Sequence, residues 1–350
     1  MPRTTDDLRI KNITEIDAPE TIIEQFPRSE KATQTVIRAR AAIHDILTRK
    51  DKRVLAIVGP CSIHDPKSAM EYASRLADLR AQLAPQMEIV MRVYFEKPRT
   101  IVGWKGLIND PDLDGSFNID QGLRTARELL LDINNLGLPA ACEFLDMATP
   151  QYLADLVSWV AIGARTTESQ IHRELSSGTS CAVGFKNSTA GDVQIAIDAT
   201  RSAAEPHHFL AITKEGKSAI ASTKGNPDCH IILRGGQTPN FEAEHVNAAC
   251  ELLEKSGLPP LLMIDASHAN SFKKHENQPK VLAEIGAQIA AGDNRIIGIM
   301  AESHLVAGAQ KHVPGQPLVY GQSITDACMD WETTRAALVK LATDIQTRNA

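Results

Sequence analysis

Short apolar runs alternate with amphipathic segments along most of the chain. The apolar runs cover residues 54–58, 88–94, 139–144, 160–165, 182–186, 208–213, 230–235, 261–267 and 296–302. Because these runs are apolar throughout rather than at every second position, they predict strands of a parallel sheet that is covered on both faces. The covering helices are predicted by apolar residues at helical spacing in segments 67–83, 123–137, 150–159, 192–204, 243–257 and 280–293.

The number of strands separates two α/β architectures. A tenth apolar segment, 218–223, follows the run at 208–213 after only four residues, which leaves no room for a crossover helix. These two segments predict an inserted β-hairpin at about 207–224, and the remaining eight strands predict a (β/α)8 TIM barrel. An open doubly wound sheet is the alternative. However, the first strand leads into GPCS and not into the GxGxxG turn of dinucleotide-binding folds.

The chain is predicted to form one barrel domain over residues 1–350. An N-terminal extension of about residues 1–48 precedes the first strand and is predicted to contain one helix, roughly 29–48. The final helix is predicted at about 326–347, which places Asp326 near its start.

Composition and charge narrow the class of function. The formal net charge of −6 argues against nucleic-acid or membrane-surface binding. No apolar run approaches the ~18 residues of a membrane span, and the N-terminus lacks a secretory signal pattern. Six cysteines without a CxxC spacing are typical of reduced thiols. These observations predict a cytoplasmic protein with no membrane or nucleic-acid partner.

Polar side chains follow the predicted strands at the end where a barrel carries its active site. They are Cys61, Arg92 with the segment EKPRT, Glu143, Arg165, Lys186, Arg234, His268 and Glu302. The cations in and beside this series are Arg92, Lys97, Arg99, Arg165, Lys186 and Arg234. Because guanidinium and ammonium groups suit phosphate and carboxylate, six cations predict a multiply charged substrate or two anionic substrates.

A second set of residues at the same end can bind a metal. Cys61 by itself could be an apolar filler, a nucleophile or a ligand. Its strand and the strands before His268 and Glu302 are the first, seventh and eighth, and the first and eighth are neighbours in a closed barrel. With Asp326, these residues form a mixed sulfur, nitrogen and oxygen set. Such a set suits a divalent Mn, Fe, Co or Zn ion better than Ca or Mg.

Nine segments resemble the type I 3-deoxy-D-arabino-heptulosonate-7-phosphate (DAHP) synthases. They are GPCSIHDP at 59–66, MRVYFEKPRT at 91–100, VGWKGLINDPDLDGSF at 102–117, AIGARTTESQ at 161–170, VGFKN at 183–187, ILRGG at 232–236, MIDASHAN at 263–270, MAESH at 300–304 and YGQSITDAC at 320–328. The resemblance extends over essentially the whole chain and is greatest to the phenylalanine-sensitive branch of the feedback-regulated class.

The resemblance implies a metal-dependent condensation of phosphoenolpyruvate with erythrose 4-phosphate, the first step of the shikimate pathway to aromatic amino acids. It implies that one divalent metal ion (Mn, Fe, Co or Zn) is bound by Cys61, His268, Glu302 and Asp326. The implied phosphoenolpyruvate ligands are Arg92, Lys97, Arg165, Lys186 and Arg234. The implied erythrose 4-phosphate ligands are Lys97, Pro98, Arg99, Thr100 and Asp326. Two phosphates and a carboxylate would account for the six cations.

The resemblance and the residue types together suggest catalytic roles for Lys97, Glu143 and His268. Lys97 is expected to protonate the alkoxide that forms from the aldehyde. Glu143 is expected to orient or deprotonate the water that adds to phosphoenolpyruvate, although it could instead only balance the charge of Arg92 or Lys186. His268 is expected to act as a metal ligand.

The extension and the hairpin resemble the feedback site for an aromatic amino acid in this family. Matching positions are Asp6, Asp7, Met147, Pro150, Gln151, Leu175, Thr179, Ser180, Phe209, Ala211 and Ala221. Pro150 and the segment TKEGKSAI favour phenylalanine, but Ala211 stands where serine is expected for phenylalanine and glycine for tyrosine. The segment KNSTAGD at 186–192 also departs from the usual KNGTDG. The family further implies a homo-oligomer, either a dimer or a tetramer.

Three other functions are compatible with a phosphate-binding barrel. A sister phosphoenolpyruvate-dependent 3-deoxy-octulosonate 8-phosphate synthase would use a longer sugar, whereas KPRT at 97–100 favours the four-carbon sugar. A non-catalytic sensor of phosphorylated metabolites would not require the complete set Cys61, His268, Glu302 and Asp326. A metal-dependent aldolase would have no use for five cations around phosphoenolpyruvate.

Overall fold

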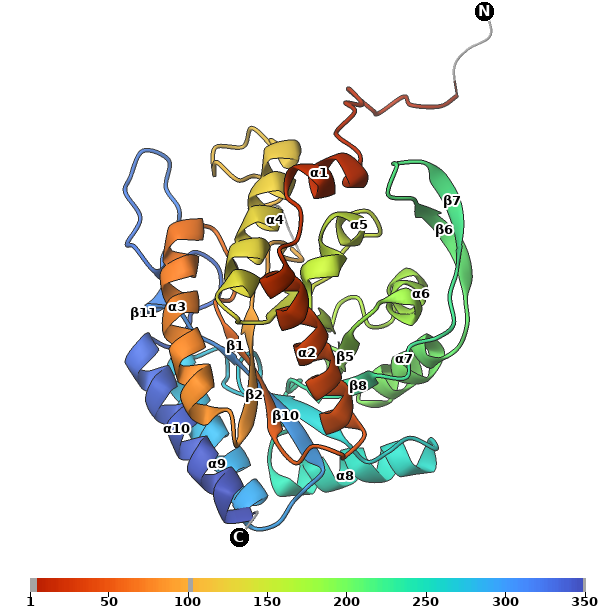
Figure 1. Ribbon diagram of the computed structural model, residues 1–350. Helices are drawn as coiled ribbons and strands as arrows, with labels where there is room; N and C mark the ends of the chain where they lie inside the picture. The colour runs from red at the N-terminus through yellow and green to blue at the C-terminus, as the bar shows by residue number, and fades with distance from the viewer. Residues whose placement is uncertain (1–4, 100–102, 349–350) are drawn as a thin grey trace, which may run out of the picture.

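Eight parallel strands close into a barrel in the computed structural model, which describes residues 5–99 and 103–348. The strands are β1 (Val54–Gly59), β2 (Met87–Arg92), β3 (Ala140–Glu143), β4 (Trp159–Ile162), β5 (Ala182–Lys186), β8 (Cys229–Leu233), β9 (Leu262–Asp265) and β10 (Ile296–Glu302). They pair in that order, and β10 closes the barrel by pairing with β1 (Figure 1). The predicted (β/α)8 barrel is confirmed.

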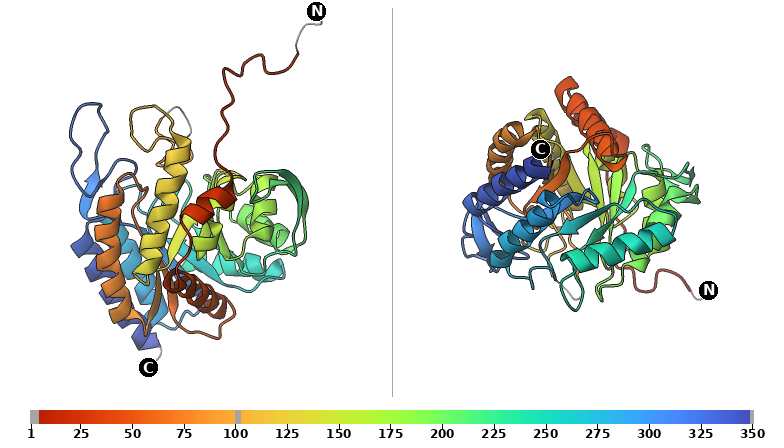
Figure 2. Two further views of the ribbon diagram at one scale, coloured as in Figure 1. Left: turned by 45° about the horizontal axis from the view of Figure 1, so that its top comes forward. Right: turned by 90° about the horizontal axis from the view of Figure 1, so that it is seen from below.

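Helices surround the barrel on its outer side (Figure 2). Those after the first strand are α3 (Pro66–Leu83), α4 (Ile119–Asn135), α5 (Thr149–Leu153), α6 (Gln170–Gly178), α7 (Gln194–Ala204), α8 (Ala243–Lys255), α9 (Gln278–Ala290) and α10 (Trp331–Arg348). Two short 3-10 helices, η1 (Ala154–Leu156) and η2 (His275–Asn277), adjoin α5 and α9. Among the described residues, no helix is both long and apolar enough to cross a membrane.

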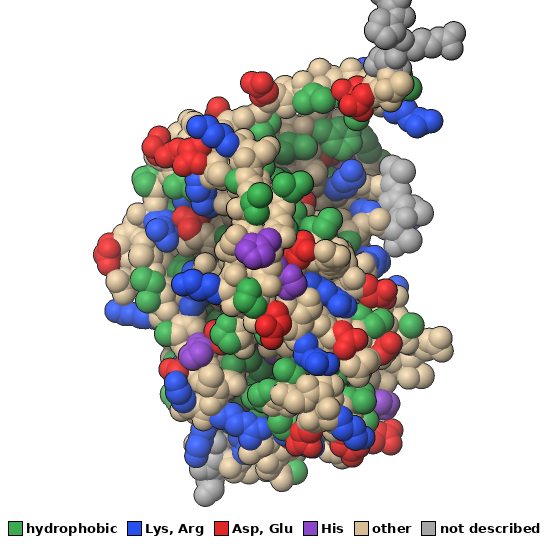
Figure 3. All heavy atoms as spheres, turned by 90° about the vertical axis from the view of Figure 1, so that its right-hand side faces the viewer, with side chains coloured by type: hydrophobic (Ala, Val, Ile, Leu, Met, Phe, Trp, Pro, Cys, Tyr) green, Lys and Arg blue, Asp and Glu red, His purple; other side chains and the backbone are tan. Residues whose placement is uncertain are grey.

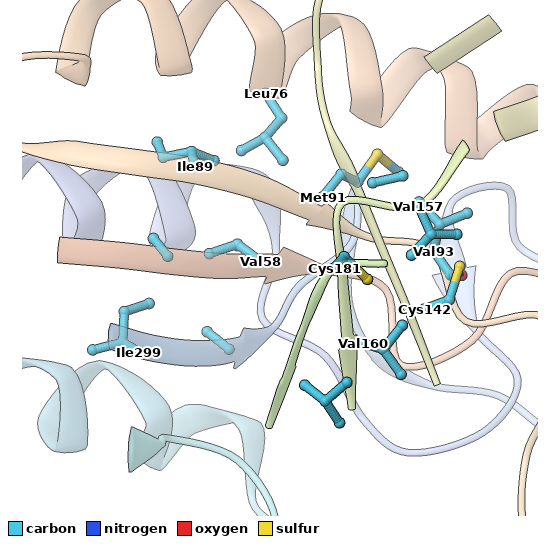
Figure 4. Close-up of a cluster of buried hydrophobic side chains, with 14 of the residues drawn as sticks. Val58, Leu76, Ile89, Met91, Val93, Cys142, Val157, Val160, Cys181 and Ile299 are labelled. Carbon is cyan, nitrogen blue, oxygen red and sulfur yellow. The ribbon is translucent and has the colours of Figure 1, made fainter. Parts of the chain in front are cut away.

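Buried apolar side chains fill the space between the strands and this helical layer. Figure 4 shows Leu76 of α3 directed toward Ile89 and Met91 of β2, with Val58 of β1 beside them. All six residues of β1 are buried, which explains why the strand sequences are continuously apolar. Packing on both faces therefore fixes each strand, and it places all eight carboxyl ends at one rim.

Local hydrogen bonds fix where several helices begin. The Asp65 side chain accepts hydrogen bonds from the backbone N–H groups of Lys67 and Ser68, and Pro66 occupies the first helical position of α3. In the same way, Ser29 caps α2 (Glu30–Leu47) by accepting from Ala32 N at 3.0 Å. In these two helices, therefore, the polar residue before the apolar pattern sets the start.

The hairpin lies outside the barrel sheet. Strands β6 (His208–Ile212) and β7 (Ser218–Ser222) pair only with each other, antiparallel, with Phe209 opposite Ala221. The pair extends along the side of the molecule beyond α5 and α6 (Figure 1). A further short pair, β11 (Val306–Ala309) and β12 (Gln322–Ser323), lies in the segment between β10 and α10.

Three predictions about helices were wrong. The extension contains two helices, because α1 (Pro19–Gln25) precedes α2. The final helix begins at Trp331 and not at Asp326, because the Asp330 side chain accepts from Thr333 N at 2.7 Å and so caps the helix there. The segment 150–159 forms only the short α5 and η1 before β4 begins.

A buried histidine in the barrel predicts how stability depends on pH. Trp159 Nε1 donates to His230 Nε2 at 3.3 Å, and burial lowers the pKa of His230 to about 4. Between pH 6.5 and 4 the unfolded chain therefore binds a proton that the folded chain excludes. Stability is expected to fall over this window as the pH falls, by about 3 kcal/mol from this group alone.

Replacing His230 by glutamine removes this titration but keeps an acceptor for Trp159. In His230→Gln the decline of the unfolding free energy from pH 6.5 to 4, measured by urea denaturation, is expected to be shallower than in the wild type. His245→Gln, which changes a half-exposed histidine on α8, is the control and should follow the wild-type curve. Parallel curves for all three proteins would contradict the assignment.

Candidate active site

The predicted residues converge at the carboxyl end of the barrel around one pocket. Among its lining are Arg92, Lys97, Pro98, Arg99, Glu143, Arg165, Lys186, Arg234, His268, Glu302 and Asp326. Each comes from a strand end or from the segment that follows it, so a parallel barrel is sufficient to bring them together. Thr100 lies outside the described residues.

Arg92 forms the floor of this pocket and is wholly buried. Its Nη2 donates to Cys61 O at 3.3 Å and to Glu302 Oε1 at 3.1 Å, and its Nε donates to Pro60 O at 3.2 Å. The guanidinium carbon also lies 3.9 Å from the centre of the Tyr94 ring. The first strand, the second strand and the last strand are thereby linked through one side chain.

Lys97 contacts the same part of the site from the loop after β2. Its Nζ donates to Cys61 O at 3.3 Å and to Cys61 Sγ at 3.2 Å. Burial alone would lower the pKa of Lys97, but the neighbouring Cys61, Glu302 and Glu143 raise it above its usual value. The side chain is therefore a cation at neutral pH.

Two further cations complete the positive wall. Arg165 Nη1 donates to Pro98 O at 3.2 Å, so the loop after β4 contacts the loop that carries Lys97 and Arg99. Arg234 is 9% exposed, and its Nε has no protein partner, so this donor is free to meet an anion in the pocket. Because Arg234 lies away from water, burial lowers its pKa, while the charge of Asp265 opposes that change.

The metal-capable side chains are also adjacent. Ligand atoms of Cys61, Glu302 and Asp326 all lie within 4.8 Å of one another, and Cys61 Sγ is 3.7 Å from Asp326 Oδ2. His268 Nε2 lies 3.9 Å from Glu302 Oε1, although His268 does not belong to that tighter group. A thiol and two carboxylates therefore lie together, with the His268 imidazole beside Glu302.

The electrostatics of this cluster favour a bound cation. Burial raises the pKa of the Cys61 thiol to about 11, and the charges of Glu302 and Asp326 act in the same direction. Desolvation would raise the pKa of Asp326, but the charges of Lys97 and His268 lower it. Sulfur, nitrogen and oxygen donors in one cluster fit a borderline divalent metal ion.

Glu143 lies at the end of β3, lines the same pocket and is 9% exposed. A Cβ at position 163 would come within 2.4 Å of Glu143 Oε1, so the glycine at that position gives this carboxylate its space. The adjoining loop contributes Glu96. Burial, together with the carboxylates of Asp146 and Glu143, raises the pKa of Glu96 to about 9, so that it is protonated at neutral pH.

The sequence analysis missed four residues at this site. Asp265 is fully buried at the end of β9, where it contacts Lys186 and His268. Gln278 exchanges two hydrogen bonds with the backbone of Glu302, at 2.8 and 3.0 Å. Tyr94 and Ser267 line the pocket. A charged residue inside an otherwise apolar strand was the available signal for Asp265.

A second hollow lies between the hairpin, α5 and α6. Its lining includes nine of the eleven predicted effector positions, namely Met147, Pro150, Gln151, Leu175, Thr179, Ser180, Phe209, Ala211 and Ala221. Figure 3 looks onto the side that carries the hairpin, where lysine and arginine side chains lie among apolar ones. The basic residues in the lining are Arg28, Arg40, Lys214 and Lys224.

Asp6 and Asp7 differ from the other predicted effector positions. Both are exposed, and neither lines the hollow. They precede an extended segment that leads away from α1 (Figure 2) and has no helix or strand before Pro19. Within one chain, therefore, the extension does not bring these two carboxylates to the other nine positions.

Comparisons with known proteins agree with this geometry. A model of the DAHP synthetase I family matches residues 25–339. The Phe-sensitive phospho-2-dehydro-3-deoxyheptonate aldolase of Escherichia coli strain K12 is 61% identical over 343 residues, which is 98% of each chain. The Trp-sensitive protein of that name from Enterobacter agglomerans is 53% identical over 344 residues, covering 98% of this chain and 99% of that one.

A solved structure is equally similar. The phospho-2-dehydro-3-deoxyheptonate aldolase of Francisella tularensis SCHU S4 superposes with a TM-score of 0.95 at 52% identity, covering 97% of this chain and 100% of that chain. The resemblance noted in the sequence is confirmed. Since the family model and these relatives span nearly the whole chain, the chain belongs to the DAHP synthetase I family.

Proposed function

We propose that this chain condenses phosphoenolpyruvate with D-erythrose 4-phosphate and water to give DAHP and phosphate. The observation that carries the proposal is the convergence of the six predicted cations on one pocket, beside the cluster of Cys61, Glu302 and Asp326. Two phosphorylated substrates bring the negative charge that such a pocket requires. Membership of the DAHP synthetase I family supports the same reaction.

We assign phosphoenolpyruvate to Arg92, Lys97, Arg165, Lys186 and Arg234. The free Nε of Arg234 supplies a donor for its phosphate or carboxylate, and the buried Arg92 holds positive charge at the pocket floor. Erythrose 4-phosphate is assigned to Lys97, Pro98, Arg99, Thr100 and Asp326. The contact between Arg165 and Pro98 joins the two groups, so both substrates would be held in reacting positions.

Cys61, His268, Glu302 and Asp326 would hold one divalent metal ion, with Mn, Fe, Co and Zn as the candidates. When bound, such an ion supplies Lewis acidity that makes the aldehyde of erythrose 4-phosphate more electrophilic. The residue set leaves room for this role because four protein ligands do not fill a five- or six-coordinate shell.

Side chains of the protein donate and accept the protons that the reaction requires. C3 of phosphoenolpyruvate forms a bond to the aldehyde carbon, and the aldehyde oxygen takes a proton from Lys97 Nζ. Water adds to C2 and loses a proton toward Glu143. The C2–O bond to phosphate then breaks while the C2 hydroxyl gives its proton to the departing phosphate, which leaves the ketone of the product and releases inorganic phosphate. Arg92 and Arg234 stabilise the charge on the departing phosphate.

The same protein is proposed to be inhibited by an aromatic amino acid that binds in the hollow beside the hairpin. Phenylalanine is favoured, because the chain is more similar to a Phe-sensitive relative than to a Trp-sensitive one. The predicted dimer or tetramer and the predicted cytoplasmic location remain proposals.

Activity is tested with both substrates. Metal-loaded protein is expected to consume phosphoenolpyruvate only when erythrose 4-phosphate is present. The measurement is the loss of the ultraviolet absorbance of the enolpyruvate group. Arabinose 5-phosphate serves as the control substrate, since a sister octulosonate synthase would use it instead. No consumption with Mn, Co, Fe or Zn would overturn the proposed function.

Cys61→Ala tests the metal assignment. We expect the metal content of the purified protein to fall and kcat/KM to decrease more than about 100-fold, because one ligand of the metal is lost. The fold should be retained, as judged by circular dichroism. Cys250→Ala, which changes a buried cysteine of α8 outside the site, is the matched control and should keep its metal. Full metal content in Cys61→Ala would remove Cys61 from the ligand set.

Glu143→Gln separates the two roles of this carboxylate. If Glu143 takes the proton from water, kcat is expected to fall roughly 100- to 10,000-fold while KM for phosphoenolpyruvate changes little. If it only balances Arg92 or Lys186, KM is expected to change and kcat to persist. Glu254→Gln on the exposed side of α8 should match the wild type.

Inhibition assays with Phe, Tyr and Trp test the effector hollow. Phenylalanine is expected to inhibit most strongly, and Ala211→Leu is expected to weaken its inhibition about tenfold or more by filling the hollow. Each rate is compared with that of the same variant without effector. Leu210→Ala, on the opposite and exposed face of the same strand, should be inhibited by phenylalanine as strongly as the wild type. Equal inhibition of both variants would place the effector elsewhere.

A further inference from the structure

Asp265 is a fully buried carboxylate at the pocket end of β9, and four donor groups surround its two oxygens. Oδ1 accepts from the Ser267 backbone N–H at 2.9 Å and from Ser267 Oγ at 2.5 Å. Oδ2 accepts from Lys186 Nζ at 2.9 Å and lies 2.9 Å from His268 Nδ1. One carboxylate thus contacts a candidate substrate ligand and a candidate metal ligand.

These contacts determine which imidazole nitrogen of His268 carries the proton. His268 Nδ1 lies 2.8 Å from Ser267 Oγ and 2.9 Å from Asp265 Oδ2. The Ser267 hydroxyl proton is engaged by Asp265 Oδ1, and an ionised carboxylate can only accept. Both neighbours of Nδ1 are therefore acceptors, so Nδ1 must be the protonated nitrogen.

With the proton on Nδ1, the uncharged form of the imidazole carries its lone pair on Nε2. That nitrogen lies 3.9 Å from Glu302 Oε1, on the side of the Cys61, Glu302 and Asp326 cluster. A lone pair on Nε2 is what a metal ligand needs, and carboxylates commonly fix this tautomer of ligating histidines. The backbone is held as well, because the carbonyl of His268 accepts from Lys273 N at 2.7 Å.

Lys186 is held by the same oxygen. Lys186 is 5% exposed, so its ammonium needs a compensating anion, and Asp265 Oδ2 provides one. Desolvation acts to raise the pKa of Asp265, but Lys186 and His268 hold it well below its usual value. The buried ion pair with Lys186, at 2.9 Å, favours the carboxylate form of Asp265.

We propose that Asp265 is the positioning residue that couples the metal ligand His268 to the phosphoenolpyruvate ligand Lys186. It fixes the Nδ1–H tautomer of one and the direction of the ammonium of the other. The identity of the two ligands rests on the proposed function, whereas the tautomer and the geometry do not. Removing the charge of Asp265 is therefore expected to weaken both metal binding and phosphoenolpyruvate binding.

Asparagine has the size of aspartate but cannot replace its hydrogen bonds. If its carbonyl oxygen faces Lys186 and His268, its NH2 group faces the backbone N–H of Ser267. If the amide is turned around, the NH2 group faces Lys186 Nζ and His268 Nδ1. Either orientation sets donors against donors, so the network must rearrange.

The experiment compares Asp265→Asn with Glu88→Gln. Glu88 is a matched control, since it is also a buried carboxylate with two cationic partners, Arg53 and Arg80, but it lies near the start of β2. In Asp265→Asn, the affinity for Co²⁺, measured by competition with a chromogenic chelator, is expected to fall roughly 10- to 100-fold. KM for phosphoenolpyruvate is expected to rise about tenfold or more.

Glu88→Gln is expected to lose stability but to keep the wild-type Co²⁺ affinity and KM. A folded Asp265→Asn with wild-type values of both would overturn the proposal. An equal loss of Co²⁺ affinity in Glu88→Gln would also overturn it, because the effect would then reflect general destabilisation.

A measurement on the wild type keeps the proposal testable if Asp265→Asn fails to fold. Metal-free protein labelled with ¹⁵N-histidine, at about pH 8, is expected to show His268 as the Nδ1–H tautomer, with His268→Gln giving the assignment. An Nε2–H tautomer would overturn the proposal. If the wild type binds Co²⁺ and shows the expected tautomer yet condenses no substrates, the proposed function fails and the role of Asp265 toward the metal stands.

Discussion

The carboxyl end of the barrel depends on how its buried charges are paired. Arg92 has no exposed surface, and its guanidinium is compensated by Glu302 at 3.1 Å, by two backbone carbonyls and by the face of Tyr94. An isolated charge in this position would cost several kcal/mol. Because Glu302 also belongs to the metal-capable cluster, the proposed anion-binding and metal-binding halves of the pocket share one ion pair.

Asp265 repeats this arrangement at the end of the neighbouring strand β9, where one carboxylate compensates Lys186 and contacts His268. Glu302 thus lies between Arg92 and His268, and Asp265 lies between Lys186 and His268. The barrel makes this possible, since neighbouring parallel strands bring the ends of β1, β10 and β9 side by side. Charges that are far apart in the sequence then balance one another over a few ångströms.

The sequence predicted the strands well because a strand that is buried on both faces has a simple pattern. Strands β5 and β10 begin and end where the apolar runs predicted. Helix α6 was missed for the opposite reason. Its buried side chains are His172, Ser176 and Ser177, while Ile171 is 54% exposed, so it has no apolar stripe to detect.

The sequence predicted those residues of the candidate site that follow a strand directly or belong to a family motif. Cys61, His268, Glu302 and Asp326 were expected to lie together; three of them do, and His268 lies just outside that group, 3.9 Å from Glu302. Asp265 and Gln278 were not expected, because hydrogen bonds to other protein groups leave no periodic pattern in a sequence. Asp6 and Asp7 show a further limit. Their match to the family motif predicted that they belong to the effector site. However, the segment that follows them is extended, and the sequence does not determine where such a segment lies in space.

The two pockets share one segment of the chain, and this constrains how they can interact. Glu143 ends β3 in the active-site pocket, and Met147, Pro150 and Gln151 line the second hollow only a few residues later. Between them, Asp146 accepts from the backbone N–H groups of Ala148 and Thr149, both at 2.7 Å, and so fixes the start of α5.

Asp146 also contacts the protonated Glu96, the neighbour of Lys97. The loop after β2 and the loop after β3 are therefore held together by a hydrogen bond between two carboxyl groups. Residues 143–151 could adopt more than one conformation. A ligand that binds in the hollow to one of these conformations better than to the others would increase the population of that conformation. Through Glu143 and Glu96 the same shift would reach Glu143 and Lys97, the two side chains proposed to transfer protons, without any contact between the two ligands.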